Sequence, residues 1–486
     1  MKIFLLNPPH TAIGSRLAGE HLPPLGLLSI AGPLLDLGYQ IKLLDADYSN
    51  MEMENIVAEI EKFNPDILLM GHSGSTSAQP TIELIANRVK AILPAIKIII
   101  GGVFPTYHWK EILTKNKAID IIVCGEGEEI ITQLIPAIAT GKIGLVDGIA
   151  YRNQHEIIKT KPAKLIKNLD DYRIAWELME GYHYTYWGKR KAVVLQFSRG
   201  CPYPCSYCGQ SLFWKKWRHR NPQKLADEIE ILHHQYGIEV INFADENPAT
   251  HQKPWIAFLK ALIAKNLNLV LVGSVRADNI VRDEAYLHLY KQAGFERFLL
   301  GIENYDENVL DKIKKDGSIA DDKKAIQLLR QHDILSMATY VTGFGDETWK
   351  DFYHNLKHLI QYDPDQIQLL YATPHQWTPY YDEVKDRIII QSDQRKWDYK
   401  HQILKTINLK PWQIILLVKL TEILLQIRPK ALKRLFFHRD KKLRAAMRWY
   451  TQIGRKVWFF EWFQFLFHDN TQADSTVMLK NFWNDF

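Results

Sequence analysis

Three cysteines fall close together in the stretch SRGCPYPCSYCGQ, residues 198–210, and they are Cys201, Cys205 and Cys208. The whole chain of 486 residues has four cysteines, and the other is Cys124. Thiolates are the usual ligands of iron–sulfur clusters. The spacing C-x3-C-x2-C can therefore supply three corners of a cubane 4Fe–4S cluster and leave its fourth iron open for a ligand.

A zinc site and a ligand role for the fourth cysteine are both less favoured. A structural zinc site closes with four ligands, and the nearby His219 is predicted to be a surface residue. Cys124 ends an apolar run and is predicted to be a small core side chain.

The opening residues MKIFLLNPPH lack the longer apolar stretch and cleavage site of a signal peptide, which predicts a cytosolic protein. Disulfides are rare in the cytosol, so clustered thiols there indicate metal or redox chemistry.

The elements that position these thiols follow a strand–helix rhythm. Short apolar strands alternate with helical segments over residues 1–150, which predicts an α/β domain with a doubly wound parallel sheet. Its turns read NPPH, GHSGSTS, GGVFPT and CGEGEE. Each is consistent with a simple tight turn, but four such loops at the carboxyl ends of parallel strands favour a binding face for a large ligand.

A second strand–helix series begins after a connector at 151–190, which holds a predicted hairpin. Six strand–helix pairs over 191–394 predict a (β/α)6 partial barrel, with the three cysteines just after its first strand, at the mouth where barrel enzymes place their chemistry. From 395 to 486 the strands stop, and a basic, aromatic-rich helical domain is expected.

The stretch CPYPCSYC resembles the signature of the radical S-adenosylmethionine (SAM) superfamily, whose open iron chelates SAM. By that resemblance Tyr207 would lie near the adenine, and Arg276 and Glu303 would hold the carboxylate and ribose of SAM. The FADEN stretch would contact the SAM amino group, with Asp245, Glu246 and Asn247 as candidates. Glu246 and Glu303 are alternatively solvated loop acids.

A doubly wound domain directly before such a barrel is similar to the cobalamin-binding subclass of this superfamily. Where the best-known pattern D-x-H-x-x-G would place a histidine on cobalt, this chain has DADYSN, so we expect cobalamin without a protein histidine on cobalt and rank His72 second as a ligand. The resemblance implies a cobalamin site made of Asn7, Pro8, Pro9, Leu25, Gly26, His72, Ser73, Ser75, Thr76, Gly101, Gly102, Gly125, Glu126 and Gly127.

Taken over its whole length, the chain is similar to the family of anaerobic magnesium-protoporphyrin IX monomethyl ester cyclases. The resemblance implies an oxidoreductase of chlorophyll and bacteriochlorophyll biosynthesis in photosynthesis, which forms the fifth ring with a keto oxygen from water. It would use a donor such as ferredoxin or flavodoxin. Phe213, Trp214 and Trp217 are predicted to wall the flat substrate, and Lys215, Lys216, Arg218 or Arg220 to meet its carboxylate, unless this is a solvated basic loop with structural aromatics.

Two other functions stay open. One is a cobalamin-dependent radical SAM C-methyltransferase, and the other is a noncatalytic cobalamin or tetrapyrrole sensor, against which the intact cysteine triplet argues.

The charge is uneven along the chain. Residues 395–468 carry 17 Lys and Arg against four acids, a balance of +13, whereas 1–394 carry 43 against 48, or −5. This distribution favours an acidic partner or membrane surface for the C-terminal segment and no nucleic acid.

The predicted helix at KKLRAAMRWYTQIGRKVWFFEWFQFLF has Leu443, Met447, Tyr450, Val457 and Phe460 at helical spacing. It either lies on an anionic membrane, as a peripheral contact, or packs as a cap over the substrate opening.

Overall fold

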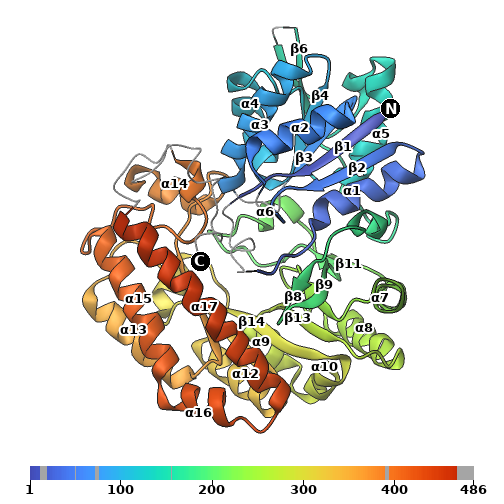
Figure 1. The fold of residues 1–486 in the computed structure, drawn as a ribbon. Helices are drawn as coiled ribbons and strands as arrows, with labels where there is room; N and C mark the ends of the chain where they lie inside the picture. The colour runs from blue at the N-terminus through green and yellow to red at the C-terminus, as the bar shows by residue number, and fades with distance from the viewer. Residues whose placement is uncertain (11–18, 50, 72–75, 155, 389–392, 468–486) are drawn as a thin grey trace. The chain divides into compact units, whose positions relative to one another are not determined.

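The structure is a computed structural model in which the chain divides into two compact units (Figure 1). The first contains Met1–His183 and the second begins at Tyr184. The structure describes all residues except 11–18, 50, 72–75, 155, 389–392 and 468–486. Both units are α/β, as predicted.

A seven-stranded sheet in the order β2-β1-β3-β4-β5-β6-β7 forms the centre of the first unit. Its first five strands are parallel, and β6 and β7 add an antiparallel hairpin at one edge. This order of the parallel strands is that of a doubly wound fold, which binds ligands beyond the carboxyl ends of its strands. The elements are β1 (Lys2–Asn7), α1 (Leu25–Asp36), β2 (Gln40–Asp45), α2 (Met53–Phe63), β3 (Ile67–Gly71), α3 (Gln79–Ile92), β4 (Lys97–Gly101), α4 (Val103–Lys115), β5 (Ile121–Val123), α5 (Gly127–Thr140), β6 (Ile149–Asn153) and β7 (Glu156–Lys159).

Burial explains why these residues form these elements. The β1 run from Ile3 to Leu6 is fully buried, as expected for a strand covered by helices on both faces. Helix α2 buries Met53, Ile56, Val57 and Ile60, one stripe at the 3.6-residue period, and ends at Asn64 in the left-handed conformation. The helices are thus held mainly by their apolar stripes.

The stretch predicted as a connector carries structure at both of its ends. The predicted hairpin is present as β6 and β7 and extends the first sheet. Thr185–Tyr186 forms β8, which pairs antiparallel with β9 (Arg190–Leu195) in the second sheet. The boundaries at 150 and 190 therefore remain a proposal.

The second unit holds a sheet in the order β16-β15-β14-β13-β12-β9-β8. All its neighbouring strands except β8 pair in parallel, so six parallel strands with their helices form the predicted (β/α)6 partial barrel. Its further elements are α7 (Pro222–Tyr236), β12 (Val240–Phe243), α8 (Gln252–Ala264), β13 (Val270–Val275), α9 (Ala277–Arg282), α10 (Leu287–Ala293), β14 (Phe295–Glu303), α11 (Glu307–Lys312), α12 (Ile319–Gln331), β15 (Leu335–Thr342), α13 (Trp349–Tyr362), β16 (Gln366–Tyr371) and α14 (Pro379–Val384).

Three helices follow the barrel, as predicted: α15 (Pro411–Ile427), α16 (Pro429–Phe437) and α17 (Lys441–Phe467). Leu443 and Met447 of α17 are buried, so this part of the stripe predicted to face a membrane is a packing surface instead. No helix in the described part of the chain is long and apolar enough to cross a membrane.

Helix α17 joins the two edge strands of the second sheet. The Trp449 ring packs at 5.8 Å from Tyr186 of β8 and at 5.2 Å from Trp187, centroid to centroid. The Tyr450 hydroxyl lies 3.5 Å from the carbonyl of Ile367 at the start of β16. These contacts lie at the ends of the strands opposite the cysteines. This part of α17 therefore packs at the base of the partial barrel, which matches neither of the two predicted alternatives, a membrane-lying helix and a cap over the substrate opening.

Candidate active site

The loop that carries the three cysteines leaves β9 and is fixed by backbone bonds. Its first residues form β10 (Ser198–Arg199), which pairs antiparallel with β11 (Arg218–His219). Ser206 then donates its backbone N–H to Ile313 over 2.9 Å and accepts one from Tyr380 over 3.0 Å. The loop is therefore tied to segments that follow β14 and β16.

The three thiols lie near one another in this loop and are half-buried. Burial raises the pKa of the Cys201 thiol to about 11, and the neighbouring Cys208 and Cys205 contribute to the rise. Burial also raises the pKa values of Cys205 and Cys208. No group of three such donors among the described residues converges on a single metal ion. Three neighbouring thiols on one loop fit a cubane cluster, in which each thiolate binds a different iron.

Tyr207 and Glu303 meet beside these thiols, as predicted for two residues of one site. Burial raises the pKa of Tyr207, and the Glu303 carboxylate, to which it is hydrogen-bonded, raises it further. Glu303 ends β14 in the left-handed conformation, with φ +64°, where the register with β15 shifts. A non-glycine residue held there costs about 1 kcal/mol or more and marks a constrained position. Its carboxylate also accepts from Lys315 over 3.4 Å.

Arg276 follows β13 and is held from two sides. Its Nε donates to Asp278 over 3.1 Å, and its guanidinium lies 3.5 Å from the centre of the Tyr203 ring. Tyr203 donates its hydroxyl to the same Asp278 carboxylate over 3.2 Å. Because Tyr203 belongs to the cysteine loop, Arg276 fixes that loop as well as presenting a positive charge to Cys201 and Cys205.

The acids after β12 are directed at the cysteine loop. Asp245 accepts from the backbone N–H of Phe197 over 3.0 Å and of Ser198 over 2.5 Å, and Glu246 accepts from that of Gly200 over 3.2 Å. Burial raises the pKa of each carboxyl to about 7, against these hydrogen bonds. Both acids are therefore engaged with the loop rather than solvated.

Asn247 is better placed than Asp245 and Glu246 to contact a ligand. Its side-chain nitrogen donates to Asn279 over 2.8 Å, while its buried Oδ1 has no partner in the structure. A buried amide oxygen without a partner is uncommon, and a bound donor group satisfies it. An ammonium group is one such donor, which fits the contact predicted for this stretch.

The aromatic residues predicted to wall a substrate contact other parts of the protein in this structure. Phe213 is buried and packs edge-on against Trp214, with ring centroids 4.8 Å apart. Trp217 donates its Nε1 to the carbonyl of Asn247 over 3.1 Å. Arg218 donates to the carbonyls of Lys216 and Trp214 at 3.2 and 3.3 Å. These contacts shape the loop, and substrate contact stays a prediction.

The structure adds three residues that sequence reasoning missed. Trp377 donates its Nε1 to the carbonyl of Gly209, next to Cys208, over 2.8 Å. His375 stacks on Trp377 with centroids 4.8 Å apart, and its Nε2 lies 2.6 Å from the Tyr399 hydroxyl. The signal was available, because the aromatic stretch TPHQWTP follows the last barrel strand and must lie at the barrel mouth.

In the first unit, the predicted cobalamin residues collect at the carboxyl ends of the parallel strands. Asn7 ends β1 and donates to Asp45 at the end of β2 over 2.8 Å. Gly102 and Gly125 follow β4 and β5 with φ +109° and +115°. The positions that a Cβ would take at Gly125 and Gly26 meet no atom within 4 Å. The open space at these two glycines would let a large planar cofactor approach the backbone closely.

The other predicted cobalamin residues differ in burial and in their hydrogen bonds. Pro8, Pro9 and Thr76 are buried. Glu126 accepts from the backbone of Ile166 over 2.9 Å, so one of its oxygens is already engaged. Three further residues of the predicted site lie at the ends of elements, namely Leu25 at the start of α1, Gly101 at the end of β4 and Gly127 at the start of α5. His72, Ser73 and Ser75 lie outside the described residues.

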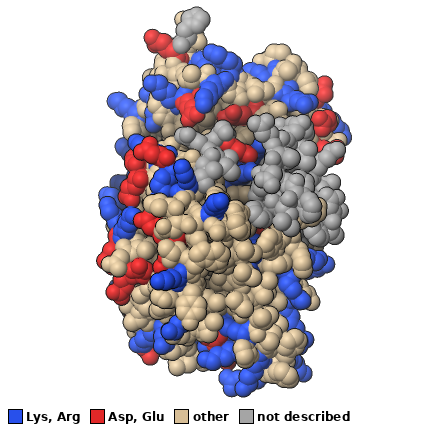
Figure 2. All heavy atoms as spheres, turned by 90° about the vertical axis from the view of Figure 1, so that its left-hand side faces the viewer, with Lys and Arg blue, Asp and Glu red and all other residues tan. Residues whose placement is uncertain are grey.

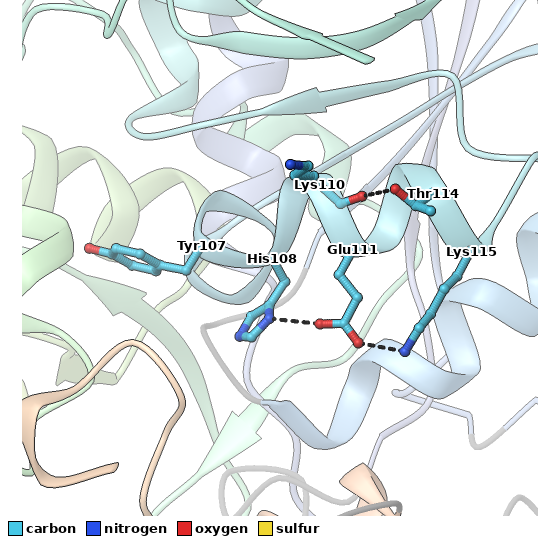
Figure 3. Close-up of a pocket in the computed structure, with 6 residues that line it drawn as sticks. All are labelled: Tyr107, His108, Lys110, Glu111, Thr114 and Lys115. Carbon is cyan, nitrogen blue, oxygen red and sulfur yellow. Dashed lines mark hydrogen bonds and ion pairs between the residues drawn. The ribbon is translucent and has the colours of Figure 1, made fainter. Parts of the chain in front are cut away.

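A separate pocket of about 390 Å³ lies along α4 (Figure 3). His108 and Lys115 both point at Glu111, at 3.3 and 2.6 Å. Burial lowers the pKa of His108 more than Glu111 raises it, which favours its neutral form. These three side chains form a chain of charge contacts along one face of α4.

Comparison with known families identifies both units. Residues 13–135 match the B12 binding domain, and residues 195–359 match the Radical SAM superfamily. The structure of the cobalamin-dependent SAM radical enzyme OxsB with aqua-cobalamin and SAM bound has the same fold, with TM-score 0.68 and 16% identity over 99% of this chain and 74% of that one. The protein is thus a cobalamin-binding radical SAM enzyme, whose cofactors are a 4Fe–4S cluster, SAM and cobalamin.

Within this class, the predicted resemblance to the cyclase family is confirmed. The chain is 51% identical to the anaerobic magnesium-protoporphyrin IX monomethyl ester cyclase of Synechocystis sp., over 99% of this chain and 97% of that one. It is 31% identical to the enzyme of that name from Rubrivivax gelatinosus, over 83% and 74% of the two chains. The chain belongs to the family of anaerobic magnesium-protoporphyrin IX monomethyl ester cyclases.

Proposed function

We propose that this enzyme catalyses the anaerobic oxidative cyclisation of magnesium-protoporphyrin IX monomethyl ester, which forms the isocyclic ring of protochlorophyllide. The carrying observation is the 51% identity, over nearly the whole of both chains, with a cyclase of that name. The propionate ester closes onto the macrocycle and gains a keto oxygen from water. Cluster and SAM, when bound, supply the radical that removes hydrogen from the unactivated propionate carbon.

We further propose the role of each group of residues in this reaction. Cys201, Cys205 and Cys208 hold the cluster. Three other groups of residues hold SAM, cobalamin and the substrate. SAM is held by Tyr207, Asn247, Arg276 and Glu303, with Asp245 and Glu246 fixing the loop beside them. Cobalamin lies against the strand-end residues of the first unit, and Phe213, Trp214, Trp217 and Arg218 border the tetrapyrrole.

Two partners complete the proposal. An electron donor such as ferredoxin or flavodoxin reduces the cluster. The enzyme is cytoplasmic and contacts a membrane peripherally through residues 395–486, whose basic excess suits an anionic surface.

The test is anaerobic turnover with reductant, SAM, cobalamin and magnesium-protoporphyrin IX monomethyl ester in oxygen-labelled water, followed by mass spectrometry. A cyclised product that carries the label supports the proposal, and Cys205→Ala should abolish it. Gain of a methyl group without ring closure would instead establish the methyltransferase. Absence of deoxyadenosine from the reduced, reconstituted enzyme would point to the sensor.

A further inference from the structure

Helix α15 has two apolar faces, and among the described residues one of them is buried and the other is exposed. Its inner stripe, Ile414, Val418 and Leu425, is buried in a core with residues of β15, β16 and α13. The opposite stripe is exposed by 37 to 55% of each side chain, and it consists of Trp412, Leu420, Ile423, Leu424 and Ile427. A helix that is apolar all round normally lies in a core or in lipid.

The two charges within α15 do not interrupt the outer stripe. Lys419 is only 3% exposed, and its ammonium group pairs with Glu422 over 2.9 Å and with Glu461 of α17. The pairs fasten α15 to α17 and draw the charges away from solvent. The outer stripe therefore runs from Trp412 to Ile427, about 22 Å along the helix, without a charge.

Helix α16 extends this surface. Leu432, Phe436 and Phe437 are exposed by 37, 52 and 78%. We call these three residues of α16 and the five residues of the α15 outer stripe, eight in all, the apolar face. Figure 2, which looks onto the side where α13 and α15 lie in Figure 1, shows a broad region of uncharged atoms with Lys and Arg gathered at its lower end. Exposed apolar patches of this kind mark interaction sites.

The charge beside the apolar face selects the partner. Residues 428–448 contain nine Lys and Arg and one acid, Asp440. Arg428 and Arg434 are used internally, on Asp363 at 2.8 and 2.6 Å. Four lysines of the segment stay exposed, namely Lys430, Lys433, Lys441 and Lys442. An apolar face bordered by lysines matches the acyl and headgroup layers of an anionic membrane leaflet.

A second copy of the chain is a poorer occupant. A two-fold contact would place the same patch on both sides and bring the basic segment of one chain against that of the other. Like charges in apposition oppose such a contact.

We propose that α15 and α16 dock the enzyme on an anionic lipid surface, with the apolar face in the headgroup boundary and the four lysines over the phosphates. The assignment rests on the peripheral membrane contact proposed above, but not on the ring-forming reaction. It replaces the α17 stripe as the membrane-facing surface, because Leu443 and Met447 are buried.

The test is flotation of the full chain with phosphatidylglycerol vesicles and with phosphatidylcholine vesicles, without substrate. Wild type should float with the first and weakly with the second, and salt should weaken the binding. Each lysine near an anionic leaflet contributes about fivefold. Lys430→Gln with Lys433→Gln should therefore weaken binding to phosphatidylglycerol about 25-fold. Ile427→Ser with Phe437→Ser should weaken it at least tenfold by removing inserted apolar area.

The matched controls are exposed residues of the first unit. Leu145→Ser, at a side chain 81% exposed, and Lys164→Gln with Lys167→Gln should leave flotation unchanged. All variants should keep the wild-type melting temperature. Failure of wild type to float with phosphatidylglycerol overturns the proposal, as does wild-type flotation of the α15–α16 variants. A dimer in sedimentation that Phe437→Ser dissociates would assign the face to a second copy instead.

Discussion

Gly200→Ala should damage the cysteine loop far more than its backbone angle alone explains. Gly200 has φ +91°, and an added Cβ would lie 2.5 Å from the carbonyl oxygen of Lys216. Gly188 has the same φ, and the position of its Cβ meets no atom within 4 Å. The two alanine variants therefore share a backbone strain of roughly 1–2 kcal/mol. They differ in the clash alone.

The clash sets the size of the difference. Ordinary van der Waals contact begins near 3.4 Å, so either the backbone at Lys216 moves by about 0.9 Å or Cys201 is displaced. Overpacking of this kind costs about 1–3 kcal/mol. At about 2 °C per kcal/mol for a unit of this size, Gly200→Ala should melt about 2–6 °C below Gly188→Ala. Thermal melts and the iron content after reconstitution measure both effects. Equal melting temperatures and equal iron would refute this account of the loop.

Three further outcomes are expected. Alanine at any signature cysteine should abolish the cluster absorption and deoxyadenosine formation, whereas Cys124→Ala should keep both; loss of the cluster in Cys124→Ala would overturn the ligand assignment. Burial raises the pKa of Glu347 to about 7 from 4.5, so the folded chain holds a proton that the unfolded chain releases, and stability falls as pH rises through that window. The free energy of unfolding of Glu347→Gln should therefore rise by about 3 kcal/mol relative to that of wild type between pH 4.5 and 7. A difference in melting temperature between the two proteins that does not change with pH would contradict this. Lys419→Met should lower the free energy of unfolding by about 3 kcal/mol, because the half-buried Glu461 loses one of its cations while Lys400 stays 3.5 Å away. Adding Glu461→Gln should recover part of this loss, as measured by urea titrations of the four-member cycle.

The sequence predicted the architecture well because each element carries its own signal. The alternation of apolar strands with amphipathic helices predicted both sheets. The position of the three cysteines just after the first barrel strand placed them at the barrel mouth. Tyr207 of the cysteine loop and Glu303 at the end of β14, both assigned to the SAM site from the sequence, are hydrogen-bonded to each other, and their contact with SAM stays a prediction. Strand order in a parallel sheet brings such residues together whatever their distance along the chain.

What the sequence could not give were the long-range partners of individual side chains. Asp245 was predicted to contact a ligand, but its carboxylate accepts backbone bonds from the cysteine loop. Helical spacing at Leu443 and Met447 identified an apolar stripe without saying what covers it. The exposed stripe is on α15, and Lys419 and Glu422 obscured it in the sequence because their ion pairing depends on α17.

The closure of the barrel base by α17 bears on how the second unit reaches its native state during synthesis. Tyr186 and Trp187 are made early, but their ring partner Trp449 leaves the ribosome only after every barrel strand. Until then the sheet has two open edges, with β8 and β16 unjoined. Contacts of such separation form slowly and leave apolar surface exposed meanwhile. Expression of a form lacking residues 441–467 should therefore yield mainly aggregated chain, because the base of the barrel would stay open beneath an intact cysteine loop.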